Sequence, residues 1–189
     1  MPKVPEMKIA ITGNIGSGKT EVLNIIKSKG YECYSADEIN RELLKKKSIQ
    51  KKIVALLNLD SFSIAEIARI VFSDESKRKD LEGLLHPLIL REIEKIATKS
   101  ELIFVEVPLL YEVGWQDHFD AVVLCSVSKE TAISRLMSQR NFEYQEAVDR
   151  YDSQLSNEEK ITKADYIIDN EKDYQHLFNQ VVTLLEENF

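Results

Sequence analysis

The sequence predicts an α/β fold in which a five-stranded parallel sheet is flanked by helices. Two observations carry this prediction. Five short apolar segments with the composition of buried strands alternate with segments of helical periodicity, and such alternation is typical of parallel sheets. A glycine-rich turn joins the first apolar segment to the first helix, and helix N-termini of this kind bind phosphate groups.

The first strand, turn and helix are predicted over residues 7–30. Residues 7–12 are apolar and rich in β-branched side chains, and apolar side chains then recur at helical spacing up to Gly30, which is placed to end the helix. Residues 13–20 match the pattern G-x-x-x-x-G-K-[ST] of a P-loop. Because a strand precedes the match and a helix follows it, a chance glycine-rich turn is disfavoured and the P-loop NTPase fold is predicted.

The chemistry of this loop predicts a site for ATP and Mg²⁺. Glycines let the backbone adopt positive φ and approach an oligophosphate, whose charge is favoured at the N-terminus of a helix. Lys19 can reach the β- and γ-phosphates, and the Thr20 hydroxyl can bind Mg²⁺. The predicted nucleotide-binding residues of this stretch are Gly13, Asn14, Ile15, Gly16, Ser17, Gly18, Lys19, Thr20 and Glu21.

Composition restricts the class of protein. The 189 residues suit one domain, 1–189, and a content of 43% hydrophobic and 30% charged residues is typical of a globular chain. A formal net charge of −7 disfavours a general nucleic-acid binder, which would carry a basic surface. No apolar run approaches membrane-spanning length and residues 1–6 lack an apolar signal region, so we expect a cytoplasmic protein without a membrane partner. Cys33 and Cys125 are expected to be buried free thiols.

Asp37 follows the second predicted strand, residues 31–35, at the edge where open α/β sheets bind ligands. Its carboxylate is a candidate to orient or deprotonate an acceptor hydroxyl, or to hold Mg²⁺ through water. Asp is also a favoured N-cap, here for a helix over residues 38–46. The sequence leaves these roles open.

Residues 38–100 show helical periodicity and no evident strand. This stretch is longer than a crossover between parallel strands requires, so it is predicted to be an inserted helical subdomain that covers the acceptor substrate. Pro87 in this stretch either kinks a helix or starts a new one. His86 beside it is interpreted as a capping or core histidine, and a ligand role would need support from elsewhere.

Glu106 interrupts the apolar run of the third predicted strand, residues 102–108. A buried acid needs a partner, and a metal ion bound to phosphate would supply one, so Glu106 is predicted to face the Mg²⁺ side of the nucleotide. The chain then leaves the sheet at its ligand-binding edge through residues 108–112, and residues 119–125 form the fourth strand.

A lid is predicted over residues 135–155, where two helices carry Arg135, Arg140 and Arg150 and end near Gln154. In small P-loop kinases, lid arginines stabilise charge on the transferred phosphoryl group, and closure excludes water. Without the P-loop, the same pattern would be interpreted as ordinary surface arginines. Residues 164–170 form the last strand and turn before a C-terminal helix.

Taken together, these motifs resemble the dephospho-coenzyme A kinase family from Lys8 to the C-terminal helix. The P-loop is followed in order by Ala36-Asp37-Glu38-Ile39, Leu85-His86-Pro87, Pro108-Leu109-Leu110-Tyr111-Glu112, Arg135-Leu136 with Arg140, Gln154 and residues 164–170. This ordered series is far more specific than a P-loop alone. The resemblance implies transfer of the ATP γ-phosphate to the ribose 3′-hydroxyl of dephospho-coenzyme A, by a core with a helical acceptor domain and a lid. We expect a monomer or a weak homo-oligomer.

The resemblance also implies roles for individual residues. Asp37 near the 3′-hydroxyl, Lys19, and Arg140 on the phosphates would be catalytic, and Asn170 would lie near the adenine end of the ATP site. Thr20 and Glu106 would hold the metal. The acceptor would be bound by Asp37, His86, Arg91, Pro108, Leu109, Leu110 and Glu112.

Some positions depart from the family pattern. Asn14 stands where the family often has a second glycine, and Asn is expected to fit because it tolerates left-handed conformations. Ser35 stands where Asp is common, and because Asp37 is retained we expect this change to tune activity rather than abolish it. Residues 62–64 lack an arginine that the family usually carries, which bears on the acceptor contacts.

Other functions are weighed against this interpretation. A kinase acting on a nucleoside, a nucleotide or a sugar acid would use the same scaffold, but the His86-Pro87 pair and the 108–112 turn favour dephospho-coenzyme A. A nucleotide-dependent switch would hydrolyse ATP slowly without an acceptor, whereas Asp37 and the lid arginines favour transfer. A nucleic-acid-binding ATPase is disfavoured by the acidic balance of the chain.

Overall fold

The computed structural model describes residues 6–189, so residues 1–5 of the N-terminal stretch considered above lie outside the described part. The chain divides into two compact units. The first contains the chain up to Ser35 together with Ser100–Phe189, and the second is Ala36–Lys99. The two boundaries coincide with the changes from strand patterns to continuous helical periodicity and back.

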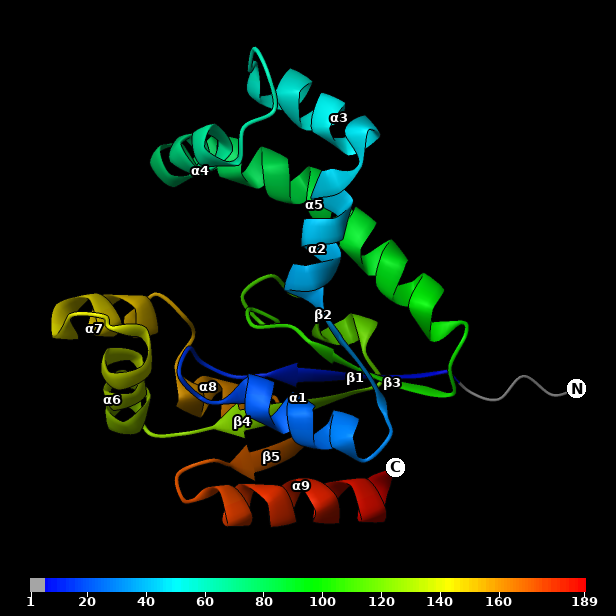
Figure 1. Ribbon diagram of the computed structural model, residues 1–189, viewed down its shortest axis with the longest axis vertical. Coiled ribbons are helices and arrows are strands. Elements are labelled where there is room, and N and C mark those ends of the chain that lie inside the picture. Colours follow the sequence, from blue (N-terminus) through cyan, green and yellow to red (C-terminus); the bar gives the residue numbers. More distant parts are fainter. Residues whose placement is uncertain (1–5) are drawn as a thin grey trace, which may run out of the picture. The chain divides into compact units, whose positions relative to one another are not determined.

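The first unit contains a five-stranded parallel sheet, as predicted (Figure 1). Its strands lie in the order β2-β3-β1-β4-β5, so β1 is central. Their bounds are β1 (Met7–Thr12), β2 (Glu32–Ser35), β3 (Leu102–Glu106), β4 (Ala121–Ser126) and β5 (Tyr166–Asp169). In β1, Ile9 pairs with Phe104 of β3 on one side and with Ala121 of β4 on the other. The turn after β1 therefore leaves the sheet at its carboxyl edge, between the ends of β3 and β4.

Helices α1 (Lys19–Ser28) and α9 (Tyr174–Asn188) pack together on one face of this sheet. The residues that meet them alternate along the strands, as in Ile9 and Ile11 of β1, because side chains of a strand point to opposite faces. The predicted end of α1 is confirmed, since Gly30 has a φ of +95° and its N–H donates to the Lys27 carbonyl.

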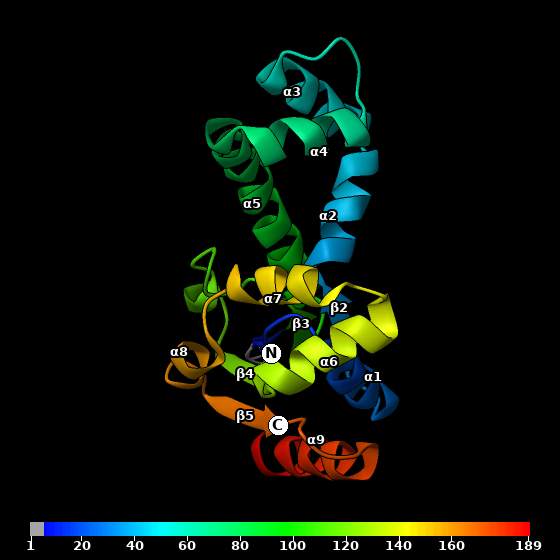
Figure 2. The same cartoon turned by 90° about the vertical axis from the view of Figure 1, so that its left-hand side faces the viewer.

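The first unit also contains α6 (Lys129–Arg140), α7 (Tyr144–Asp152), α8 (Asn157–Ile161) and the short 3₁₀ helix η1 (Gln116–His118). Helices α6 and α7 lie side by side and are held by an apolar contact among Ile133, Leu136 and Ala147 (Figure 2). They form the segment that the sequence predicts as a lid. Helix α8 contacts β4.

Both cysteines lie in strands and are free thiols, as predicted. Cys125 is buried, whereas Cys33 is half-buried and not fully buried as expected. Burial raises the pKa of Cys33 and of Cys125 to about 11. Because the thiolate is the reactive form, both side chains are poor nucleophiles at neutral pH.

The second unit consists of helices α2 (Ala36–Lys45), α3 (Lys47–Leu57), α4 (Ile64–Ser73) and α5 (Glu75–Ala97). Side chains cap the N-termini of two of these helices. Ser63 Oγ accepts the Glu66 N–H of α4, and Asp74 Oδ1 accepts the Lys77 N–H of α5. Lys46 pairs with Glu92 at 3.2 Å and so joins the start of α3 to α5.

Two alternatives that the sequence leaves open in this unit are excluded by the structure. Asp37 does not cap a helix that begins at residue 38, because α2 already begins at Ala36, directly after β2, and Asp37 lies in its first turn. There its carboxylate favours the positive end of the helix without occupying the cap position. Pro87 does not start a new helix, because α5 runs from Glu75 to Ala97 with Pro87 inside it.

Candidate functional site

The P-loop backbone is shaped by three glycines in conformations that other residues rarely adopt. Their φ angles are +150° at Gly13, +81° at Gly16 and +90° at Gly18. A Cβ atom on Gly13 would lie 2.3 Å from the Cys125 carbonyl oxygen, and one on Gly16 would lie 2.7 Å from that of Ala132. The loop therefore lies directly against the end of β4 and the first turns of α6, with no room for side chains at these positions.

The Lys19 ammonium group is buried within the loop that precedes it. Its Nζ donates to the carbonyl oxygen of Gly13 at 2.9 Å and to that of Asn14 at 3.1 Å. Burial lowers the pKa of Lys19, and the negative charge of Glu106 is the largest opposing influence. The charge of Arg140, at the end of α6, also acts on Lys19 and lowers its pKa. The structure thus brings the predicted residues Lys19, Glu106 and Arg140 into one electrostatic environment.

Asn170 supports the second half of the P-loop. Its Nδ2 donates to the Ser17 carbonyl at 2.7 Å, and a Cβ on Gly18 would lie 2.2 Å from the same nitrogen. Arg135 Nη2 in turn donates to the Asn170 carbonyl at 2.8 Å. Within residues 6–189, Arg135 Nη1 is buried without a hydrogen-bond partner, and it lies 3.9 Å from the position of that Cβ. Arg135 therefore holds an unused donor beside the P-loop.

These residues fit a nucleoside triphosphate with Mg²⁺. The loop is a cradle in which Cβ atoms would clash, it contains a buried ammonium group, and the exposed Thr20 hydroxyl and Glu21 carboxylate lie in the first turn of α1. Glu106 ends β3 at the same edge of the sheet. No cluster of three or more His, Cys, Asp or Glu side chains suited to a metal ion occurs in residues 6–189. Mg²⁺ does not require one, because in such sites it is bound by one or two protein groups together with phosphate oxygens.

The arginines of the segment predicted to be a lid make two kinds of contact. Arg135 and Arg140 of α6 interact with the P-loop region, the first through Asn170 and the second through its charge on Lys19. Arg150 of α7 pairs with Glu146 one turn earlier, at 3.0 Å, and stacks on the Phe142 ring at 4.7 Å. Arg150 therefore stabilises α7 and its contact with the chain after α6 locally.

Asn14 is accommodated for a different reason from the one predicted. Among the described residues, left-handed conformations outside glycine occur at Asn58 and Asn141, so Asn14 makes no use of the tolerance of Asn for positive φ. Instead its buried Nδ2 donates to the Leu155 carbonyl at 2.9 Å. The neighbouring Ile15 N–H donates to Gln154 Oε1 at 2.8 Å. The chain after α7 is therefore tied to the first half of the P-loop, which local sequence patterns do not reveal.

The turn after β3 contributes both to the core and to this tie. Leu110 is fully buried, so it acts through packing, whereas Leu109 is exposed and Pro108 half-buried. Glu112 Oε1 accepts the Leu155 N–H at 3.0 Å and lies 2.8 Å from Nζ of Lys160, a fully buried residue of α8. Sequence reasoning missed Lys160, because a lysine in a short polar helix is normally exposed.

The predicted acceptor residues of the second unit lie on two of its helices. Asp37 is exposed in the first turn of α2, and Arg91 is exposed on α5. His86 is half-buried on α5, and burial lowers its pKa. His86 therefore favours its neutral form at physiological pH.

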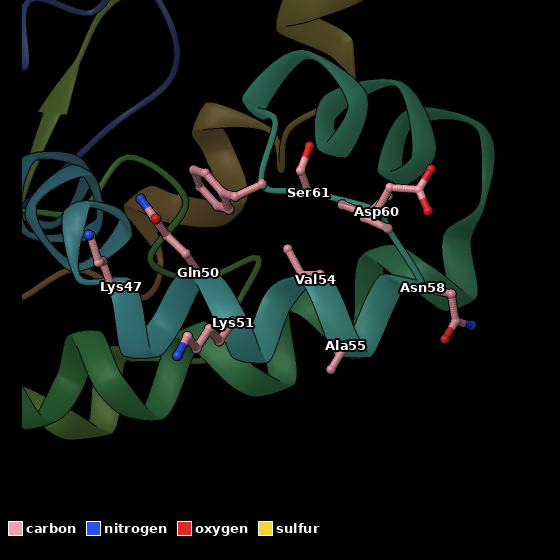
Figure 3. A pocket seen from close by; sticks show the side chains of 10 residues that line it. Lys47, Gln50, Lys51, Val54, Ala55, Asn58, Asp60 and Ser61 are labelled. Carbon is pink, nitrogen blue, oxygen red and sulfur yellow. The ribbon is translucent and has the colours of Figure 1, made fainter.

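A separate cavity of about 530 Å³ lies in the second unit, between α3 and the chain that leads to α4 (Figure 3). Gln50 and Val54 point from α3 toward the segment with Ser61. The lining residues are Lys47, Gln50, Lys51, Val54, Ala55, Asn58, Leu59, Asp60, Ser61 and Phe62. None of the predicted site residues is among them.

None of the helices in residues 6–189 has the length and apolar character needed to cross a membrane.

A family model and the named relatives of similar sequence agree on one family. A family model described as dephospho-CoA kinase matches residues 7–176. The dephospho-CoA kinase of Rickettsia prowazekii (strain Madrid E) is 33% identical over 185 residues, which cover 96% of this chain and 97% of that protein. The dephospho-CoA kinase of Campylobacter jejuni has a structure that superposes with a TM-score of 0.70 at 28% identity, covering 95% of this chain and 96% of the other. A Thermus thermophilus protein, TT1252, superposes with a TM-score of 0.85 at 29% identity over 99% and 100% of the two chains. The chain belongs to the dephospho-CoA kinase family.

Proposed function

We propose that this chain transfers the γ-phosphate of ATP to the ribose 3′-hydroxyl of dephospho-CoA and so completes coenzyme A synthesis. The observation that carries the proposal is the family match over residues 7–176, which includes a fully formed P-loop with Lys19 at its centre. The P-loop supports ATP as the phosphate donor. The family, and the relatives that bear its name, support dephospho-CoA as the acceptor.

Lys19, Thr20 and Glu106 are assigned to the phosphate end of the nucleotide. The Lys19 ammonium would exchange the carbonyls of Gly13 and Asn14 for β- and γ-phosphate oxygens, which are the stronger acceptors. The Thr20 hydroxyl and the Glu106 carboxylate would hold Mg²⁺. When bound, Mg²⁺ would bridge the phosphates and neutralise charge that develops in transfer.

Asp37 and Arg140 are assigned to the transfer itself. Asp37 is an exposed carboxylate whose proposed role is to orient the 3′-hydroxyl and accept its proton. Arg140 is an exposed guanidinium at the end of α6 whose charge already acts on Lys19, and its proposed role is to stabilise the transferred phosphoryl group. Residues 135–155 would act as a lid that excludes water.

Acceptor recognition is assigned to the second unit and to the turn after β3. His86 and Arg91 on α5, with Pro108 and Leu109 of that turn, would contact dephospho-CoA. A neutral His86 would offer one donor and one acceptor, and Arg91 a fixed positive charge. Asn170 would lie near the adenine end of the ATP site, and its hydrogen bond to the Ser17 carbonyl would fix the P-loop there.

The remaining assignments concern partners and location. The acidic net charge of −7 supports a small-molecule substrate rather than nucleic acid. We assign the chain to the cytoplasm as a monomer or a weak homo-oligomer. Sedimentation of the purified chain over a range of concentrations tests the second assignment.

The decisive experiment measures ADP release from MgATP with and without dephospho-CoA, together with the mass of the product. The proposal expects ADP release to depend on the acceptor and the acceptor to gain one phosphate, located at the 3′ position by fragmentation. ADP release without acceptor dependence would contradict the kinase assignment. If dephospho-CoA is inert but a nucleoside, nucleotide or sugar acid gains phosphate, the acceptor assignment is wrong and the kinase assignment stands.

A further inference from the structure

The chain between α7 and α8 forms hydrogen bonds to the P-loop and to the turn after β3. Toward the P-loop, Gln154 Oε1 accepts the Ile15 N–H at 2.8 Å and the Leu155 carbonyl accepts from Asn14 Nδ2 at 2.9 Å. These two bonds hold consecutive residues of the P-loop between Gly13 and Gly16. We call Gln154–Leu155 the strap.

The strap is anchored on its other side by a carboxylate. The Leu155 N–H donates to Glu112 Oε1 at 3.0 Å, and the same oxygen lies 2.8 Å from Lys160 Nζ. The path from Lys160 to the P-loop thus runs through Glu112, the peptide groups of Leu155, and Asn14. All of its members lie in the first unit.

The burial of the Lys160 side chain at this position costs free energy. It has no exposed surface, and within residues 6–189 its Nζ has the ion pair with Glu112 but no hydrogen bond. Glu112 Oε2 is likewise buried without a hydrogen bond in that range. An apolar pair of similar volume would avoid the desolvation of two charges. An apolar pair would not hold the Leu155 N–H, because that donor needs an oxygen fixed in one position.

Helix α8 gives Lys160 a fixed base. The helix begins with a capping box, in which Ser156 accepts the Glu159 N–H and Glu159 Oε2 accepts the Ser156 N–H. Asn157 Nδ2 donates to Ser126 Oγ at the end of β4 at 2.9 Å. The ammonium group is therefore held relative to the sheet, and Glu112 is held by the ammonium group.

We propose that Lys160 and Glu112 are positioning residues that fix the P-loop for ATP through the strap and Asn14. Neither side chain touches the nucleotide in this role. The inference rests on the proposed function only in taking ATP as the phosphate donor. Loss of the ion pair makes the strap mobile and weakens its hydrogen bonds to Asn14 and Ile15. The P-loop must then become ordered when it binds phosphate, which lowers the affinity for the nucleotide.

The test is a double-mutant cycle between two residues that are joined through Glu112 and Leu155. The charge of Lys160 also acts directly on Lys19, and an effect by that route alone would add to the effect of Asn14→Ala. Asn14→Ala removes the amide contact, and since Asn14 has no positive φ, alanine fits its backbone. Lys160→Met removes the charge and keeps most of the buried stem. The dissociation constant of MgADP is measured by calorimetry for wild type, both single variants and the double variant.

Each single change is expected to weaken MgADP binding about tenfold, and the double variant is expected to weaken it about tenfold as well, because both changes break one path. A double variant about a hundredfold weaker than wild type would show independent effects and overturn the proposal. An unchanged dissociation constant in Lys160→Met would also overturn it. Lys163→Met is the matched control, since Lys163 is exposed three residues further on, and it should bind MgADP like wild type.

A substitute variant and steady-state kinetics distinguish a positioning role from a loss of folding. If Lys160→Met alone does not fold, the charge-neutral pair Glu112→Gln with Lys160→Met takes its place in the cycle, because it leaves no unpaired charge buried. In steady-state kinetics the positioning role raises the KM for ATP while the KM for dephospho-CoA stays unchanged, whereas a general loss of structure would move both. If wild type binds MgADP but does not phosphorylate dephospho-CoA, the proposed function fails and this inference stands. If the wild type phosphorylates dephospho-CoA but the variants bind MgADP normally, the proposed function stands and this inference fails.

Discussion

Lys19 shows how a single residue is prepared for phosphate by its own loop. Its ammonium group is bound by the carbonyl oxygens of Gly13 and Asn14, which are fixed by the glycine conformations and by the packing of the loop on β4. Burial lowers its pKa, while Glu106 acts in the opposite direction. A nucleotide phosphate adds further negative charge beside the ammonium group and so favours the protonated form.

The role proposed for Asp37 is chemical rather than structural. Because it lies exposed in the first turn of α2, Asp37→Asn is expected to leave the fold and the MgADP dissociation constant unchanged. Turnover should fall by about 10²-fold or more, since the proton acceptor for the 3′-hydroxyl is lost. Steady-state rates with MgATP and dephospho-CoA, with calorimetry for MgADP, measure both effects. Glu38→Gln changes the next acid on the same turn and serves as the control, and equal losses in both variants would remove Asp37 from the chemistry.

Gly13 is the P-loop position with the least room for a side chain. In Gly13→Ala the new Cβ would meet a backbone oxygen at 2.3 Å, and φ is +150°, so the loop or the end of β4 must shift. We expect the free energy of unfolding to fall by about 1–3 kcal/mol and MgADP binding to be lost. Urea unfolding and calorimetry provide the measurements. A variant with wild-type stability and binding would show that the loop tolerates a conformation different from the one described here.

At the scale of elements, α5 contains both a proline and a glycine in its interior, and each has a cost. Pro87 removes one backbone donor from the helix, yet the helix continues for ten residues beyond it, to Ala97, because the residues on its packed side remain apolar. Those residues are Leu85, Ile89, Ile93 and Ala97, all of which are buried. Tertiary packing thus outweighs the local preference of proline.

Gly83 offers the matched test of this helix. A Cβ added there meets no atom within 4 Å, and φ lies outside the left-handed region. Gly83→Ala is therefore expected to raise the free energy of unfolding by about 0.5–1 kcal/mol, because alanine loses less backbone entropy in a helix. Urea denaturation checks the value, and a decrease would mean that the glycine serves a contact that the folded chain does not show. ATP turnover should not change.

At the scale of the whole molecule, nucleotide binding and folding are linked. A ligand that binds the folded chain alone stabilises it by about 2.7 kcal/mol at a concentration a hundred times its dissociation constant. For a chain of this size we expect MgADP at that concentration to raise the unfolding temperature by about 5–10 °C. Lys19→Ala should show little of this shift at the same concentration, because the buried ammonium group is lost. Thermal unfolding with and without MgADP measures the shift. An equal shift in Lys19→Ala would show that the nucleotide does not bind through the P-loop lysine.

Features whose cause is local can be predicted from the sequence. A β-branched run, three glycines and an apolar helix face define the strand, the P-loop and α1 within residues 7–30, since backbone preference and short-range periodicity act there. The same reasoning gave the parallel sheet, the two strand cysteines and the helical character of 38–100. It misplaced a boundary that depends on neighbours at Ala36, where α2 begins directly from β2, and it left open whether Pro87, which lies inside α5, starts a new helix.

Contacts between residues that are distant in the chain become visible only in the folded structure. Asn14 was expected to fit through its backbone, but its amide bonds Leu155, 141 residues later in the chain. Glu112 is predicted from the sequence to bind substrate, and only the fold shows that its carboxylate meets Lys160 and the Leu155 N–H, which we interpret as positioning. A side chain's partner across such separations follows from the order of the strands and the packing of helices on them, and no periodicity in the sequence encodes it. The buried charge of Lys160 is the clearest case, because only the fold supplies the carboxylate that makes its burial possible.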